Sequence, residues 1–126
     1  MKKVVVTEKL HEHGMALLSA RKDINAVYAD GDKNRVLAEI PDAQAILVRT
    51  MILTAQDLEV AQQLEVVSRH GVGCDNITVQ HCSDRSIPVA IATDSNTVSV
   101  VEHVMMMMLA LNKRAFQYDE ITRSGR

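Results

Sequence analysis

The chain contains 126 residues, of which 47% are hydrophobic and 24% charged, and this balance is typical of one compact globular domain. Its formal net charge of −2 and its three aromatic residues argue against a nucleic-acid-binding protein, which needs a basic surface or rings that stack on bases. The two cysteines, Cys74 and Cys82, fit a reducing compartment better than a disulfide framework, so we expect a cytoplasmic protein.

Short apolar segments alternate with segments of helical periodicity through residue 92. The segments predicted as strands are 3–7, 24–28, 45–48, 66–70 and 88–92. The segments predicted as helices are 11–20, 35–40, 54–62 and 79–85, with Thr54 as the N-cap of the third. Strands that are continuous apolar runs are typical of a parallel sheet covered on both faces. Right-handed crossovers therefore predict an α/β fold with a doubly wound parallel sheet of about five strands.

Three segments that follow predicted strands carry groups suited to binding an anion. Ligands of such sheets bind outside the carboxyl ends of the strands. Arg49 follows the third strand, the loop at 69–73 ends the fourth, and residues 93–97 follow the fifth. Guanidinium groups bind carboxylate or phosphate, and bare N–H groups of a glycine turn beside Arg69 and His70 would suit the same ligand. The simpler interpretation is a tight turn, with both arginines as solvated surface charges.

Gly71 and Gly73 match the first two glycines of the dinucleotide-binding fingerprint G-x-G-x-x-G. Asn76 occupies the position of the third glycine, which the fingerprint needs where its helix packs closely on its strand. We therefore predict that this turn is not the loop that binds a dinucleotide pyrophosphate.

Two other ligand-binding folds share the alternating pattern but lack their marker residues here. A receiver-type signalling domain needs paired acids after the first strand and an aspartate closing the third. This chain has threonine and glutamate at 7–8, and arginine and threonine at 49–50. A flavin carrier needs a phosphate loop rich in serine, threonine and glycine after the first strand, and residues 8–11 do not form one.

Two groups of residues have metal-ligating side chains without the pattern of a metal site. Cys74, His81 and Cys82 are suitable ligands by type, but their spacing is not that of a paired zinc knuckle. The four consecutive methionines at 105–108 lie in an apolar helical segment and are interpreted as packing residues. We therefore predict no metal site.

The last part of the chain changes character. Residues 99–102 match a capping box, with Ser99 as the N-cap and Glu102 three residues later, so a helix is predicted to begin there. Through Leu111 this helix is apolar on every side, which indicates that it is covered on every side. It is too short to span a membrane. We place a domain boundary here, with residues 1–98 in the sheet domain and 99–126 in a helical segment.

Four motifs extend over most of the chain: LVRT at 47–50, RHGVGCDNI at 69–77, RSIPV at 85–89 and NTVSVVEH at 96–103. In order and spacing they resemble the D-isomer-specific 2-hydroxyacid dehydrogenases, the D-3-phosphoglycerate dehydrogenase branch above all. The resemblance implies a flavodoxin-like substrate domain, followed by a long helix that packs against a nucleotide domain and the partner subunit. Together with the apolar circumference of the helix, it predicts a homodimer built around residues 100–118. The net charge and the short length of the helix predict no nucleic-acid or membrane partner.

The resemblance also implies roles for the loops at the strand ends. The expected substrate-binding residues, which would face a carboxylate or phosphate, are Arg49, Arg69, His70, Gly71, Val72 and Gly73. Val72 would also contact the nicotinamide side of NAD, and residues 96–99 would form the hinge between the domains. The family's catalytic arginine, glutamate and histidine, and its nucleotide fingerprint, would all lie beyond Arg126. No catalytic residue is therefore assigned in this chain.

These expectations describe the N-terminal portion of an NAD-dependent oxidoreductase that acts on the CH–OH group of a D-2-hydroxy acid. The whole enzyme would take a small 2-hydroxy or 2-oxo acid and NAD, with NADP left open, whereas this portion alone would be inactive. The alternative is a non-catalytic module for ligand sensing or protein interaction, derived from the same family.

Overall fold

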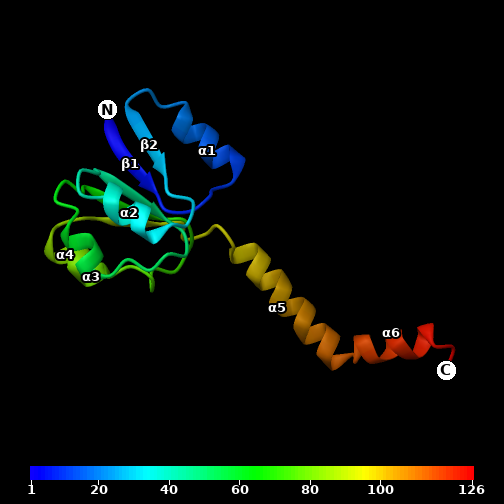
Figure 1. Ribbon diagram of the computed structural model, residues 1–126. Coiled ribbons are helices and arrows are strands. Elements are labelled where there is room, and N and C mark those ends of the chain that lie inside the picture. Colours follow the sequence, from blue (N-terminus) through cyan, green and yellow to red (C-terminus); the bar gives the residue numbers. More distant parts are fainter. The chain divides into compact units, whose positions relative to one another are not determined.

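The computed structural model describes residues 1–126, which separate into two compact units, 1–93 and 94–126 (Figure 1). The strands of the first unit are β1 (Lys2–Val6), β2 (Ile24–Tyr28), β3 (Ala45–Val48), β4 (Val66–Arg69) and β5 (Val89–Ile91). Its helices are α1 (Glu12–Ser19), α2 (Lys33–Glu39), α3 (Ala55–Glu59) and α4 (Val79–Asp84). All neighbouring strands are parallel, in the flavodoxin-like order β2-β1-β3-β4-β5. The predicted doubly wound sheet of five strands is confirmed.

Alternate residues of β1 enter two separate hydrophobic clusters, because successive side chains of a strand point to opposite faces of the sheet. Val5 belongs to the larger cluster, which includes fully buried residues of α2, α3 and α4 (Val36, Leu58 and Cys82) and the α2 C-cap residue Ile40. Val4 and Val6 belong to the smaller cluster, with Leu10 and the α1 residues Met15 and Leu18. Burial on both faces explains why residues 4–6 of β1 are a continuous apolar run rather than an alternating one.

Short-range capping sets where α2 and α3 begin. The Asp32 carboxylate accepts hydrogen bonds from the backbone N–H groups of Asn34 and Arg35 at the start of α2. Thr54 caps α3 in a reciprocal capping box with Asp57, so the predicted N-cap is confirmed. This helix ends at Glu59, three residues before the predicted end.

The second unit contains α5 (Thr97–Asn112) and α6 (Ala115–Arg123). Lys113 and Arg114 separate them, and Arg114 is in the left-handed conformation, with φ 49° and ψ 39°. The capping box predicted at Ser99 is wrong, because Ser99 and Glu102 both lie inside α5. Asn96, a residue type favoured at N-caps, stands three positions earlier, and its carbonyl accepts from the Val100 N–H at 2.9 Å. None of the helices is both long enough and apolar enough to cross a membrane.

Candidate functional site

Three loops meet at the edge of the sheet where the parallel strands end. They follow β1, β3 and β4, because the carboxyl ends of parallel strands share one edge. The loops after β3 and β4 run side by side, since the Leu53 N–H donates to the Asn76 carbonyl at 2.8 Å and Leu53 forms a parallel bridge with Ile77. The backbone therefore places the segments at 49–53 and 70–77 in direct contact.

Glu8, the second residue after β1, holds the loop that follows β3. Its carboxylate accepts from the backbone N–H groups of Arg49, Thr50 and Met51 at 2.9, 2.8 and 2.9 Å. The hydroxyl groups of Thr7 and Thr50 also donate to it. Burial disfavours the charged carboxylate, but these hydrogen bonds outweigh it and lower the pKa of Glu8 to about 2. Three N–H groups that could have received a ligand anion are therefore occupied by the chain's own carboxylate.

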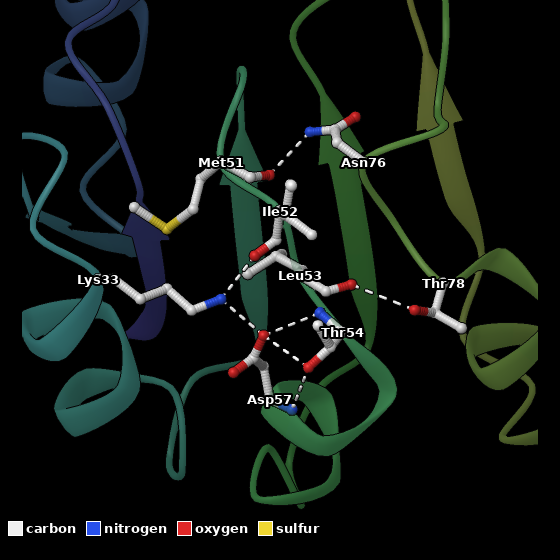
Figure 2. Close-up of polar contacts among 8 residues, drawn as sticks. All are labelled: Lys33, Met51, Ile52, Leu53, Thr54, Asp57, Asn76 and Thr78. Atoms are coloured by element: carbon white, nitrogen blue, oxygen red, sulfur yellow. Dashed lines mark hydrogen bonds and ion pairs between the residues drawn. The ribbon is translucent and has the colours of Figure 1, made fainter.

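Asn76 connects the loops after β3 and β4. Its side-chain amide donates to the Met51 carbonyl at 2.8 Å, as Figure 2 shows, and to the Arg49 carbonyl at 3.4 Å. Its amide oxygen accepts from Arg69 Nε at 3.0 Å. The position at which a dinucleotide fingerprint would carry its third glycine thus carries a side chain that forms cross-loop hydrogen bonds.

Gly71 forms the turn at the end of β4. Its φ of 155° lies in a region that side-chain-bearing residues rarely adopt, and the Arg69 guanidinium lies where a Cβ would be placed. That guanidinium also donates to the His70 carbonyl. The Gly71 N–H donates to the Arg69 carbonyl at 2.9 Å, so the expectation of free N–H groups in this turn does not hold for Gly71.

Four of the six sequence-predicted binding residues line two different hollows at this edge, whereas Gly71 and Val72 line neither. The loop hollow, of about 250 Å³, is lined by Thr50, Arg69, Gly73, Asp75 and Asn76. The basic hollow, of about 310 Å³, is lined by Lys9, Leu10, His11, Arg49 and His70. Arg49 and Arg69 thus stand at the same edge of the sheet but do not line one hollow. Val72 lies between the two turn glycines with 37% of its surface exposed.

A network of polar contacts supports the loop after β3 from the side of the helices (Figure 2). Lys33 of α2 donates to the Ile52 carbonyl and forms an ion pair with Asp57 at 2.6 Å. Burial disfavours ionisation of Asp57, but the hydrogen bond from Lys33 and those within the capping box lower its pKa. The Thr78 hydroxyl donates to the Leu53 carbonyl at 3.3 Å. These contacts hold the backbone at residues 52–54, directly after the segment that Glu8 holds.

The cysteines and histidines do not converge on a metal-binding arrangement. Cys82 is fully buried in the core, where burial raises the pKa of its thiol, whereas Cys74 is half-exposed in the turn after β4. His81 lies 3.4 Å from a carboxylate oxygen of Glu59. No group of three histidine, cysteine, aspartate or glutamate side chains is placed to hold a metal ion.

The model of the family described as D-isomer specific 2-hydroxyacid dehydrogenase, catalytic domain, matches residues 4–122. The chain belongs to this family. The resemblance inferred from the four motifs is therefore confirmed. D-3-phosphoglycerate dehydrogenase from Mycobacterium leprae is 32% identical over 123 residues, covering 96% of this chain and 23% of that protein. The enzyme of the same name from Methanocaldococcus jannaschii is 36% identical over 111 residues, covering 87% of this chain and 21% of that protein.

Solved structures share the fold of this chain. The PH0520 protein from Pyrococcus horikoshii superimposes with a TM-score of 0.82 at 24% identity, over 99% of this chain and 38% of that one. D-lactate dehydrogenase from Aquifex aeolicus, solved with NAD and lactic acid, gives a TM-score of 0.80 at 23% identity, over 98% of this chain and 37% of that one. The chain thus spans less than a quarter of these two curated relatives and less than two fifths of these two structures.

Reasoning from the sequence missed three residues that hold the loops at this edge of the sheet: Glu8, Lys33 and Asn76. Glu8 carried a usable signal, because it follows a predicted strand and so belongs at the same edge as Arg49. Asn76 was treated only as a missing glycine. Lys33 carried no local signal, since its partners Ile52 and Asp57 lie 19 and 24 residues along the chain.

Proposed function

We propose that this chain forms the substrate-side wall of an NAD-dependent oxidoreductase that acts on the CH–OH group of a D-2-hydroxy acid. The observation that carries the proposal is the family match over residues 4–122, supported by relatives named D-3-phosphoglycerate dehydrogenase. The whole protein would bind a small 2-hydroxy or 2-oxo acid together with NAD or NADP. The free cysteines and the family suggest that it works in the cytoplasm.

Residues 1–126 do not fit the pyrophosphate of a dinucleotide. The three N–H groups after β3 are filled by Glu8, and Asn76 replaces the glycine that close packing of the fingerprint requires. We therefore propose that NAD is held by a part of the protein outside this chain, with the exposed Val72 as the contact toward the nicotinamide.

The proposed work of this chain is to position the substrate anion. Arg49 and His70 would bind the carboxylate from the basic hollow, while Arg69, Gly71, Val72 and Gly73 form the adjoining wall. Arg69 is already oriented by Asn76 and by the His70 carbonyl, so little of its side-chain freedom remains to be lost on binding. The proton and hydride chemistry would belong to groups outside residues 1–126.

The gene sequence downstream of the codon for Arg126 tests the proposal directly. We expect the reading frame to continue into a strand, a G-x-G-x-x-G turn and a helix within a few tens of residues, because this unit binds the pyrophosphate. A native stop codon immediately after Arg126 would contradict the proposal that the protein is a dehydrogenase. The alternative, a non-catalytic module for ligand sensing or protein interaction, would then remain.

The 126-residue chain alone should bind NAD poorly and show no dehydrogenase activity. The physical reason is that a pyrophosphate needs a helix N-terminus with free N–H groups, and the N–H groups after β3 are already occupied. Isothermal titration calorimetry with NAD measures this, with the nucleotide domain of a relative as the positive control. Saturable binding at micromolar NAD would show that the nucleotide site has been misplaced.

The proposal includes a homodimer formed through residues 100–118. No residue of α5 or α6 is buried within the chain, although α5 carries an almost continuous set of apolar side chains. The exposed members are Val100, Val101, Val104, Met105, Met106, Met107, Met108, Leu109 and Leu111. An exposed apolar surface of this extent marks an interaction site.

A further inference from the structure

The corner between α5 and α6 is formed by a residue type that rarely ends a helix. Lys113 is the C-cap of α5, and the next residue, Arg114, has φ 49° and ψ 39°. This left-handed conformation is unfavourable for residues with a Cβ, so many helices place glycine at this position. The end of α6 has that glycine, because its C-cap Ser124 is followed by Gly125 with φ 71°. The residue type thus favours the end of α6 but not the end of α5.

The sequence around the corner favours a helix that continues. Residues 97–123 contain neither glycine nor proline, the two residues that most often interrupt a helix. Lys113, Arg114 and Ala115 at the corner itself are all good helix formers. No residue type in this segment therefore requires the chain to leave the helical path.

The corner also leaves backbone donors without acceptors. The N–H groups of residues 115–117 donate to no group of the chain, and the first bonded N–H of α6 is that of Tyr118, which donates to the Arg114 carbonyl at 3.1 Å. Arg114 stands at the N-cap position of α6, but its side chain forms no capping hydrogen bond. In a continuous helix each of the three N–H groups would donate to the carbonyl four residues earlier. Straightening would therefore add three backbone hydrogen bonds and remove the left-handed residue.

No burial or ion pair secures the bent arrangement. Phe116 and Tyr118, the aromatic residues that follow the corner, are 76% and 58% exposed, and no residue of α5 or α6 is buried. The ion pair of this unit joins Asp119 to Arg123 within α6 and does not cross the corner. The bent form and a continuous helix thus differ in the backbone conformation at Arg114, with no buried contact to break between them.

We propose that Arg114 is a hinge at which α5 and α6 exchange between the bent form and one continuous helix over residues 97–123. Straightening extends the apolar surface of α5, because Phe116 follows Leu109 by about two helical turns and Met105 by about three, on the same side. The continuous helix thus offers a partner a longer apolar surface than α5 alone. The hinge depends neither on the proposed dehydrogenase activity nor on the proposed homodimer.

Amide hydrogen exchange of the isotope-labelled 126-residue chain tests the hinge. Arg114→Gly removes the penalty on the left-handed conformation and favours the bent form, whereas Arg114→Ala keeps the penalty and favours the continuous helix. We expect the amides of residues 115–117, after correction for intrinsic rates, to exchange about fivefold faster or more in the glycine variant than in the alanine variant. The parent should lie near the alanine variant, because arginine and alanine differ little in helix propensity.

Residual dipolar couplings of the N–H bonds distinguish bending from fraying of α6. All N–H bonds of a continuous helix lie along one axis, so the couplings of α5 and α6 should match in Arg114→Ala and diverge in Arg114→Gly, while the Cα shifts of α6 stay helical in both.

Glu102→Gly is the matched control, because it places a glycine at an exposed position inside α5. It should speed exchange near residue 102 and leave the amides of residues 115–117 within about twofold of the parent. Two results would overturn the hinge. Full exposure of these amides in the parent and in both Arg114 variants would show a corner fixed in the bent form. Protection in all three equal to that at the centre of α5 would show a single straight helix.

Discussion

Replacing Glu8 with glutamine should lower the free energy of unfolding by about 2 kcal/mol, the cost of losing charge-assisted hydrogen bonds and leaving donors without acceptors. One carboxylate oxygen accepts from the Thr50 and Met51 N–H groups, and the other from the Arg49 N–H and the Thr7 hydroxyl. A glutamine side chain supplies one oxygen, so its amide nitrogen would face N–H groups that cannot accept from it. Urea unfolding followed by circular dichroism measures the loss.

The pH dependence of this effect follows from the lowered pKa of Glu8. Because the folded-state pKa is about 2 and the unfolded value is near 4.5, the carboxylate stabilises the fold above about pH 5 and loses this contribution as the pH falls toward 2. Glu8 is partly exposed, so solvent screening limits the pH-linked share to about 1–2 kcal/mol. The difference in stability between the parent and Glu8→Gln should therefore shrink on acidification.

Glu12→Gln is the matched control for this prediction. It makes the same chemical change four residues later, at an exposed carboxylate in the first turn of α1. A surface change of this kind should alter stability by less than about 0.5 kcal/mol. If Glu8→Gln were no more destabilising than Glu12→Gln, the carboxylate would not be holding the loop after β3.

The strands and most helix starts were predictable because the residues that define each of them lie close together in the sequence. β1, β3 and β4 each contain a short run of apolar residues, and Thr54 caps α3 through Asp57, three residues away. The capping box predicted at Ser99 was wrong, because α5 begins one turn earlier, with Asn96 at the N-cap position but without a capping hydrogen bond from its side chain. Local patterns thus identified the elements but did not fix the first residue of α5.

The hydrogen bonds of the site were not predictable in the same way, because they join residues far apart in the sequence. Glu8 and Met51 are 43 residues apart, and their contact depends on the parallel pairing of β1 with β3. Because the carboxyl ends of parallel strands share one edge of the sheet, the sequence predicted that Arg49 and Arg69 lie at the same edge. The sequence could not predict that the two arginines line different hollows, because the position of Arg69 depends on its side-chain hydrogen bond with Asn76.

Replacing both Met105 and Met108 with glutamate should dissociate the proposed homodimer. Their side chains are 52% and 60% exposed within the single chain, and the other apolar residues of α5 are exposed to a similar extent. Each Leu or Met that becomes fully buried at an interface contributes roughly 1.5–3 kcal/mol relative to exposure, so several of them together strongly favour association. Two buried carboxylates without partners would reverse this gain.

Light scattering across a dilution series measures the association state of the parent and the variant. Glutamate is a good helix former, so α5 should persist by circular dichroism and the loss should be confined to association. Lys22→Glu changes the net charge by the same two units at a site outside the second unit, and should leave the parent's dimer or larger assembly intact.

Methionine is well suited to such an interface, because its flexible thioether adapts to an irregular partner surface. Met105 and Met108 are three residues apart and lie on one side of α5, where a partner helix would contact both. A parent chain that remains a monodisperse monomer at high micromolar concentration, with α5 still helical, would contradict the homodimer. Dissociation by Met105→Glu with Met108→Glu, but not by Lys22→Glu, would instead place the interface on this helix rather than on the charged surface of the sheet unit.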